Sequence, residues 1–305
     1  MKRAYRKIFW RIGQEITPET FKQADNYISA QHNLIRRLIN RQYYGLFPVK
    51  DAKMPSINVN ATLKGAEIMM EQLNCMGITR GGCLIDFQDS QLRNIRQKRL
   101  SITSQSAAVC YVVLRVYPFD HLLIEPVDNE ETPFAIPVYD FEIRDLAHIE
   151  GNELPVLKIN NNRQHPYIDW NYIPPSMSIC SHGRLMEYYR NFNQIIAEIL
   201  TLITQKKAHL VQLIYPVSSL IFDMEHFSLN EPPFYFIQLL KKIVKTIGLF
   251  IPEIQKSHEA VLKAPYYHDD IAGLLQGLIK CFQDIKMIIG KEEIEVEVED
   301  LTPRI

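Results

Sequence analysis

The β-rich half of the chain is defined by one run of ten residues, Ala107-Ala108-Val109-Cys110-Tyr111-Val112-Val113-Leu114-Arg115-Val116. The run is almost continuously apolar, short and rich in β-branched side chains, which is typical of a strand buried on both faces. Shorter strand candidates follow at 122–124, 134–138 and 156–159. Eight prolines lie between Pro118 and Pro175, and proline excludes long helices. The pattern of short strands and prolines therefore predicts that this half of the chain forms a β-sandwich.

One helix is expected ahead of these strands. Between Thr20 and Leu38 the apolar residues recur at steps of three and four, which places them on one helical face. Thr17 precedes the pattern as a candidate cap, and Pro18 suits the first helical turn.

The apolar period changes to that of helices near residue 185. A stripe from Leu185 to Ile214, interrupted only by Lys206 and Lys207, predicts one helix of about thirty residues, about 45 Å long. Further stripes predict a helix at 236–247 and another at 271–289. Pro252 is expected to kink or end the first of these, and Gly290 to close the second.

Long amphipathic helices joined by prolines predict a helical bundle. The core of this bundle, and of a trimer axis built on it, is expected to contain Phe192, Ile196, Ile199, Ile203 and Leu210. The fold class is therefore α+β, with a β-rich domain at 1–178, a helical bundle at 179–290 and an acidic tail or edge strand at 291–305. In the tail, acidic and apolar residues alternate from Glu293 to Asp300.

Length and composition narrow the classes of protein. A chain of 305 residues favours two domains, and a net charge of −1 argues against a general nucleic-acid binder. The five cysteines are scattered without a CxxC pair, and no signal peptide or membrane-spanning run is visible. We therefore expect a cytoplasmic protein with reduced thiols and no direct insertion into a membrane.

Charge is balanced in total but not along the chain. Residues 1–50 carry ten Lys or Arg against three acids, a net charge of +7. Residues 120–155 carry ten acids against Arg144 alone, a net charge of −9. This asymmetry favours a subunit that assembles with neighbours, although two separate solvated faces are an equal alternative.

His268-Asp269-Asp270 is the one cluster with the composition of a chemical site. It permits a metal-dependent hydrolase, but consecutive residues seldom converge on one ion. The simpler interpretation is that Asp269 or Asp270 caps the helix that begins near Ile271. No residue is assigned a catalytic role, and no cofactor or metal is expected.

The segment from Phe9 to Tyr27 carries a distinctive spacing of anchors: Trp10, Gly13, Pro18, Phe21, Asp25 and Tyr27. It resembles the opening of the TssK family of type VI secretion baseplate subunits, Trp-x-x-Gly-x-x-Leu-x-Pro-Gln-His-Phe-Gln followed by Asp-x-x-Tyr. Glu19 and Thr20 replace the Gln-His pair, and Lys22 replaces the glutamine after the phenylalanine.

Three later segments resemble the same family in the same order. They are Tyr44-Gly45-Leu46, Tyr172-Ile173-Pro174-Pro175 before a long helix, and Ala264-Pro265-Tyr266-Tyr267-His268-Asp269-Asp270-Ile271. The last is similar to the family's Leu-Pro-x-Tyr-x-His-x-x-Leu segment. Together the anchors extend from residue 9 to residue 271.

The resemblance implies a non-enzymatic homotrimer in which a β-sandwich shoulder precedes the helical bundle. It implies a baseplate at the inner face of the cell envelope, with wedge proteins of the TssF and TssG type and a membrane-anchoring complex as partners. On this basis the wedge interface is expected at Trp10, Gly13, Pro18 and Phe21. The chain ends about fifteen residues after Gly290, so we expect the family's usual third domain to be absent.

Two other functions stay open on the sequence alone. One is a tail or receptor-binding protein of a phage-like particle, which shares the sandwich-and-bundle architecture. The other, from a different class, is the metal-dependent hydrolase centred on His268, Asp269 and Asp270.

Overall fold

The computed structural model describes Gly13, Glu15 and residues 17–39, 44–48, 56–95, 98–103, 107–124, 134–161, 165–205 and 211–291. Its helices are α1 (Pro18–Ile39), α2 (Gly183–Gln205), α3 (Val211–Glu225), α4 (Pro233–Phe250), α5 (Pro252–Ser257), α6 (Glu259–Lys263) and α7 (Ile271–Lys291). Its strands are β1 (Gly45–Leu46), β2 (Ile57–Lys64), β3 (Glu67–Ile78), β4 (Leu84–Phe87), β5 (Arg99–Ser101), β6 (Val109–Ile124), β7 (Phe134–Arg144), β8 (Glu153–Asn160) and β9 (Tyr167–Ile168). The α+β class predicted from the sequence is confirmed.

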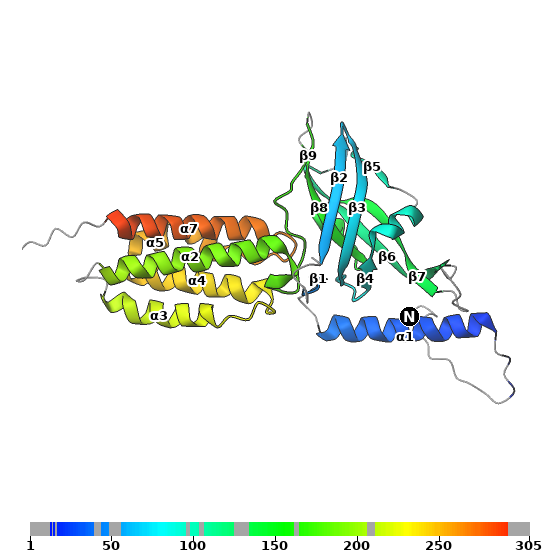
Figure 1. Ribbon diagram of the computed structural model, residues 1–305, viewed down its shortest axis with the longest axis horizontal. Helices are drawn as coiled ribbons and strands as arrows, with labels where there is room; N and C mark the ends of the chain where they lie inside the picture. The colour runs from blue at the N-terminus through cyan, green and yellow to red at the C-terminus, as the bar shows by residue number, and fades with distance from the viewer. Residues whose placement is uncertain are drawn as a thin grey trace, which may run out of the picture. The chain divides into compact units, whose positions relative to one another are not determined.

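The chain divides into two compact units (Figure 1). The sheet unit comprises Met1–Met186 together with the short segments Leu229–Phe234 and Tyr266–Ala272. The helix unit comprises Glu187–Ser228, Tyr235–Pro265 and Gly273–Ile305. The sequence predicted contiguous domains, 1–178 and 179–290, whereas the structure groups two short later segments with the sheets.

The sheet unit contains two antiparallel sheets. In the first, β3 is the central strand: β2 pairs with it along Glu67–Cys75, and β1, β4 and β5 also pair with β3. In the second, the strand order is β7-β6-β8-β9. Both sheets contribute side chains to one hydrophobic core, including Leu73 and Ile85 from the first and Leu114 and Phe141 from the second.

Strand β6 contains the predicted run from Val109 onward and continues beyond it to Ile124. Cys110, Val112 and Leu114 face the shared core, and Tyr111 and Val113 pack with Ile149 and Tyr172 on the other side. All five of these β6 residues are buried, so the prediction of a strand buried on both faces is confirmed. Residues 122–124 are not a separate strand, because β6 continues through them after a register shift between Tyr117 and His121.

Helix α1 begins at Pro18, as predicted. The Thr17 hydroxyl accepts a hydrogen bond from the Thr20 backbone N–H at 3.3 Å, and the Thr20 hydroxyl accepts one from the Thr17 N–H at 2.9 Å. These reciprocal bonds satisfy N–H groups that the first turn leaves without helical partners.

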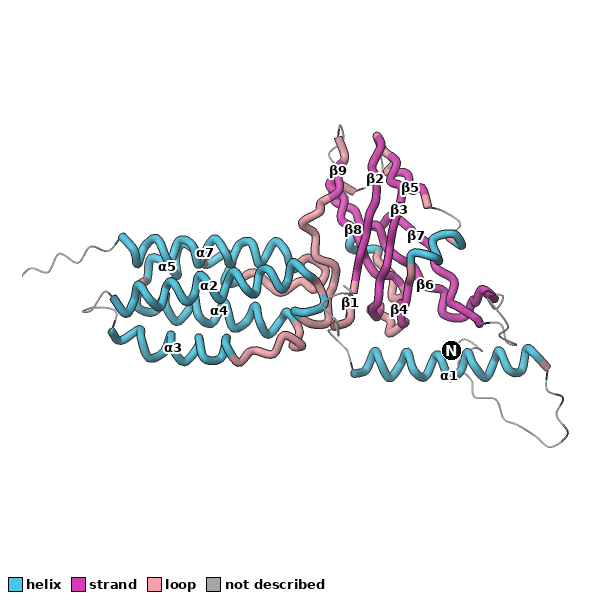
Figure 2. Tube along the Cα trace, in the orientation of Figure 1, coloured by secondary structure: helices cyan, strands magenta, loops and turns pink. Residues whose placement is uncertain are grey.

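The helix unit places α2, α3, α4 and α7 side by side (Figure 2). Phe192 of α2 packs against Phe236 of α4 and Phe282 of α7, with ring centroids 5.7 and 5.4 Å apart. The predicted single helix from 185 to 214 is wrong. The chain reverses instead, since the Tyr189 hydroxyl near the start of α2 donates to the Met224 carbonyl near the end of α3 at 3.2 Å.

The later helices agree more closely with the prediction. Helix α4 ends at Phe250 and α5 begins at Pro252, because proline is tolerated in a first helical turn but not in a helix interior. Helix α7 includes Gly290 and ends at Lys291, one residue beyond the predicted cap. None of the helices in the described ranges combines the length and apolar content needed to cross a membrane.

Candidate functional site

Three segments that are distant in sequence meet around Tyr44 in the sheet unit. The Tyr44 hydroxyl donates a hydrogen bond to Asp269 and accepts one from Arg80 at 2.9 Å. The Tyr44 carbonyl accepts a hydrogen bond from His268, and the two rings stand edge to face with centroids 4.8 Å apart. We refer to Tyr44, Arg80, Tyr266, His268 and Asp269 as the Tyr44 cluster.

Gly45 brings the chain close enough for this cluster to form. Its φ of +114° is one that residues with side chains rarely adopt, and a Cβ there would lie 1.9 Å from the Pro175 carbonyl oxygen. The next residue, Leu46, is fully buried and donates its N–H to Pro175 at 2.8 Å. The segments at 44–46, 172–175 and 266–271, which the sequence identified separately, are therefore neighbours.

His268 uses both ring nitrogens inside the cluster. Nε2 lies 2.6 Å from the Tyr44 carbonyl, which only accepts, so Nε2 carries the proton. Nδ1 lies 2.7 Å from the Tyr266 hydroxyl, which therefore donates to it. Burial lowers the pKa of His268 from its usual 6.5, in agreement with a neutral ring.

Asp269 and Arg80 form the charged side of the cluster. Their carboxylate and guanidinium groups are 2.8 Å apart, and the Arg80 guanidinium lies 5.2 Å from the centroid of the Tyr44 ring. Burial, followed by the negative charge of Asp269, raises the pKa of Tyr44 well above its usual value. The Tyr44 hydroxyl is therefore protonated and acts as a hydrogen-bond donor to Asp269.

His268, Asp269 and Asp270 do not converge on one point. Asp270 binds Lys158 of β8 at 3.2 Å, while Asp269 binds Arg80 and His268 binds Tyr44 and Tyr266. In the described part of the chain, no group of three His, Cys, Asp or Glu residues is arranged to hold a metal ion. The geometry does not support the hydrolase built on these residues.

The helix-cap interpretation of the two aspartates stays a prediction. Both stand immediately before α7, which begins at Ile271. Their carboxylates, however, reach residues of the sheet strands and the β3–β4 turn, at Lys158 and Arg80. Sequence spacing contains no information on these partners, which lie more than one hundred positions away.

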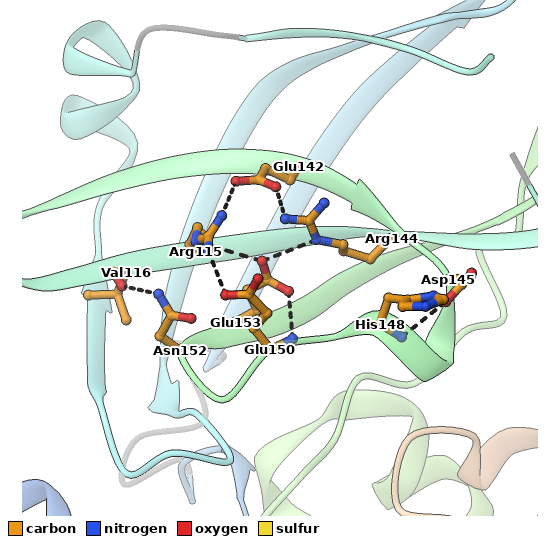
Figure 3. Close-up of polar contacts among 9 residues, drawn as sticks. All are labelled: Arg115, Val116, Glu142, Arg144, Asp145, His148, Glu150, Asn152 and Glu153. Carbon is orange, nitrogen blue, oxygen red and sulfur yellow. Dashed lines mark hydrogen bonds and ion pairs between the residues drawn. The ribbon is translucent and has the colours of Figure 1, made fainter. Parts of the chain in front are cut away.

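A second polar cluster lies across β6, β7 and β8 (Figure 3). Arg115 contacts Glu142 and Glu150, each at 2.5 Å, and Arg144 contacts Glu142 and Glu153. Glu153 is fully buried, and its second oxygen accepts the Glu150 N–H at 2.8 Å. We refer to these five residues as the Arg115 network.

The Arg115 network explains part of the acidic stretch at 120–155. Three of its acids, Glu142, Glu150 and Glu153, are paired with two arginines of the second sheet. Their charge is therefore partly compensated inside the chain, and these residues are less available to a basic neighbour than a count of charges indicated.

The residues predicted for the wedge interface lie at the start of the chain. Gly13 is exposed with a φ of +80°, Pro18 begins α1, and Phe21 is exposed on its first turn. Trp10 lies outside the described residues.

Four of the five residues predicted for the bundle and trimer core lie in α2. Phe192, Ile196, Ile199 and Ile203 are buried within a single copy of the chain. They pack inside the bundle, so a trimer contact would have to use other faces. Leu210 lies outside the described residues.

Comparison with known proteins gives the fold but no sequence relative. No family model and no curated protein matches the sequence. A crystal structure of TssK superposes with a TM-score of 0.59 at 13% identity, covering 92% of this chain and 69% of that one.

Two assemblies contain chains with the same architecture. A chain of the type VI secretion system TssK-TssF-TssG baseplate subcomplex has a TM-score of 0.59 at 14% identity, covering 92% of this chain and 99% of that one. A chain of the baseplate complex from the type VI secretion system has a TM-score of 0.56 at 12% identity, with coverages of 91% and 99%. The protein therefore has a TssK-like fold.

Proposed function

We propose that this chain is a structural subunit of a type VI secretion baseplate and that it performs no catalysis. The observation that carries the proposal is the TssK-like fold, which covers 92% of the chain and recurs in a complex with TssF and TssG. The agreement is independent of sequence similarity, which is only 13–14% for these structures.

The polar clusters support a structural role. Both ring nitrogens of His268 are engaged in hydrogen bonds, and Arg80 and Asp269 pair with each other. General acid or base catalysis needs a titratable group that reaches a substrate, whereas His268 is buried and its two ring nitrogens contact the chain itself. In the proposed role the clusters hold segments of the sheet unit together.

In the proposed assembly, the sheet unit is a β-sandwich shoulder and the helix unit is the bundle that follows it. Three copies form a homotrimer, which binds wedge proteins of the TssF and TssG type. The trimer also links the baseplate, at the inner face of the cell envelope, to a membrane-anchoring complex. The wedge contact is assigned to Trp10, Gly13, Pro18 and Phe21.

Affinity purification of the tagged chain from its native cell tests this function. We expect wedge subunits of the TssF and TssG type to be recovered and identified by mass spectrometry. Recovery of phage tail and capsid proteins in their place would contradict this function and would favour a tail or receptor-binding protein of a phage-like particle.

The wedge contact has its own test in the same purification. The double variant Trp10→Ala, Phe21→Ala is expected to lose the wedge subunits while it keeps the oligomeric mass of the unaltered chain. Tyr215→Ala is the matched control, because Tyr215 is a highly exposed aromatic residue on α3 in the helix unit. Equal recovery with the double variant and the control would refute the assignment.

A further inference from the structure

A cavity of about 190 Å³ lies between the two sheets of the sheet unit. Its floor is apolar, since Val59 of β2 belongs to the first sheet and Val156 and Leu157 of β8 belong to the second. All three side chains pack in or against the shared hydrophobic core. An apolar cavity of about 150 Å³ holds a benzene molecule, so this one has room for a phenyl or branched aliphatic group. We refer to it as the β2–β8 cavity.

The rim of the β2–β8 cavity is polar and carries both signs of charge. Asp169, Trp170 and Arg184 line the rim, and all three are more exposed than the floor residues Val156 and Leu157. Neither Asp169 nor Arg184 forms an ion pair with any residue that the structure describes. The rim therefore complements a ligand that carries one negative and one positive group.

His182 adds a hydrogen-bond donor to the same wall of the cavity as Arg184. Its Nδ1 accepts the backbone N–H of Arg184 at 3.2 Å, so the proton of the neutral ring is on Nε2. Burial, followed by the positive charge of Arg184, lowers the pKa of His182 to about 4, so the ring is neutral at pH 7. Within the described part of the chain Nε2 has no hydrogen-bond partner, and it is available to donate to a ligand oxygen.

The start of helix α2 favours negative charge at this wall. Helix α2 begins at Gly183, between His182 and Arg184, and is 23 residues long. The N-terminal end of a helix carries a partial positive charge that attracts anions. Together with the Arg184 guanidinium and the His182 donor, it assigns the negative end of a ligand to this wall.

We propose that the β2–β8 cavity binds a free α-amino acid with an aromatic or branched apolar side chain. The side chain occupies the apolar floor, and the carboxylate contacts Arg184 and His182. The ammonium group contacts Asp169 beside Trp170, whose indole ring also attracts cations. Oδ1 of Asp169 accepts the backbone N–H of Asn171 at 3.0 Å, which leaves Oδ2 for the ammonium group.

A ligand with a single charge complements this rim less well. A carboxylic acid without an amine would cover Asp169 and remove it from water without a partner. An amine without a carboxylate would do the same to Arg184. A charge that loses water and gains no partner is costly, so an amino acid is favoured over either simpler ligand.

Calorimetric titration of the full chain with three probes tests the ligand class. L-phenylalanine is expected to bind. N-acetyl-L-phenylalanine, which lacks the ammonium group, and L-phenylalaninamide, which lacks the carboxylate, are each expected to bind at least about tenfold more weakly. Failure of L-phenylalanine to bind at millimolar concentration would overturn the proposal, and so would equal affinity for either of the other two probes.

Two rim variants assign each charge of the probe to its partner. Arg184→Gln is expected to bind L-phenylalanine and the amide equally. Asp169→Asn is expected to bind L-phenylalanine and the N-acetyl compound equally, while its side-chain oxygen still accepts the Asn171 N–H. Arg93→Gln is the control, because Arg93 is exposed outside the cavity and its loss is expected to leave the affinity unchanged. Unaltered probe preferences in both rim variants would refute the assignment.

A third variant tests whether the β2–β8 cavity is the place of binding. Val59→Phe fills the apolar floor from a half-buried position on β2, so binding of L-phenylalanine is expected to be lost. Circular dichroism checks that the variant is folded, and undiminished binding to it would place the ligand elsewhere and overturn the proposal. Amino-acid binding and wedge binding are measured separately, so failure of one leaves the other standing.

Discussion

The two polar clusters of the sheet unit are built in opposite ways. In the Tyr44 cluster, Tyr44 and Arg80 contact residues that lie 189 to 225 positions further along the chain. The Arg115 network joins residues that all lie between Arg115 and Glu153, on paired strands of one sheet and on the turn before β8. The Tyr44 cluster therefore holds together segments that are distant in the sequence. The Arg115 network adds side-chain contacts between strands that backbone hydrogen bonds already pair.

The difference also affects how each cluster tolerates change. Beside the Tyr44 cluster, the close approach of Gly45 to Pro175 leaves no room for a side chain. Within the cluster, the buried His268 ring contacts the Tyr44 carbonyl directly. In the Arg115 network two arginines share three carboxylates, so a lost contact leaves another nearby. We expect substitution of Gly45 to lower the free energy of unfolding most, and loss of the Arg80–Asp269 ion pair to lower it least.

The largest effect is expected for Gly45→Ala. The added Cβ would meet the Pro175 carbonyl, and the positive φ is strained, so the free energy of unfolding is expected to fall by more than about 4 kcal/mol. Gly65→Ala is the control, because Gly65 also has a positive φ but nothing lies within 4 Å of its added Cβ. Its loss is expected at about 1 kcal/mol.

Urea unfolding followed by tryptophan fluorescence measures both losses. The chain has two tryptophans, and one of them, Trp170, belongs to the described part of the sheet unit. Similar losses for the two glycine variants would show that the close approach at Pro175 is unimportant.

A smaller effect is expected for Glu153→Ala in the Arg115 network. Removal of the buried carboxylate takes one contact from each of Arg115 and Arg144, which both keep Glu142, and leaves the Glu150 N–H without its acceptor, at a cost of about 2 kcal/mol in unfolding free energy. Glu150→Ala, whose side chain is 52% exposed, is expected to cost less than about 1 kcal/mol. Equal costs would mean that burial of Glu153 does not matter to the network.

The stability contributed by the Tyr44 cluster is expected to depend on pH, because the cluster contains the buried residue His268. Burial holds the pKa of His268 below 6.5 in the folded protein, so the unfolded chain binds the proton more readily. Its contribution to stability is complete above pH 6.5 and is lost as the pH falls below that value. Between pH 7 and pH 5, the free energy of unfolding is therefore expected to fall less in His268→Gln than in the unaltered chain.

The comparison must be made as a difference between two proteins. Burial also lowers the pKa of His182, to about 4, and this residue acts in the same direction in both the unaltered chain and the variant. Parallel pH profiles for the two proteins would contradict the assignment of the acid sensitivity to His268.

The smallest effect is expected for Arg80→Gln. The Arg80 side chain is 49% exposed, and exposed ion pairs contribute about 0.5 kcal/mol. The loss should shrink further in about 1 M salt, where charges are screened within about 3 Å. A loss that is independent of salt would point to packing of Arg80 on the Tyr44 ring as its main contribution.

Sequence patterns predicted those parts of the fold that depend on local periodicity. Strand β6 and helices α1, α4 and α7 follow from the spacing of their own apolar residues. The reversal between α2 and α3 was missed, because an apolar stripe keeps its period whether or not the chain turns back. The contact between Tyr189 and Met224 joins residues 35 positions apart and leaves no local trace.

The candidate site was predictable only as separate pieces. Tyr44-Gly45-Leu46, Tyr172-Ile173-Pro174-Pro175 and the segment around His268 were each recognised, and their order was the only signal that they belong together. No spacing rule places Asp269 beside Arg80, because tertiary packing makes that contact. The Arg115 network was hidden for another reason: a count of charges does not show which acids face an arginine.

The sheet unit is assembled from three separate stretches of the chain, and this affects how it can be made and dissected. Tyr44 finds its partners only when residues 268 and 269 exist, so on a ribosome the unit is incomplete until most of the protein has been synthesised. A fragment that stops at Met186 would contain every strand that the structure describes but neither His268 nor Asp269. Such a fragment would lack the contacts that His268 and Asp269 make with Tyr44. The stability measured for it would therefore not represent that of the sheet unit in the full chain.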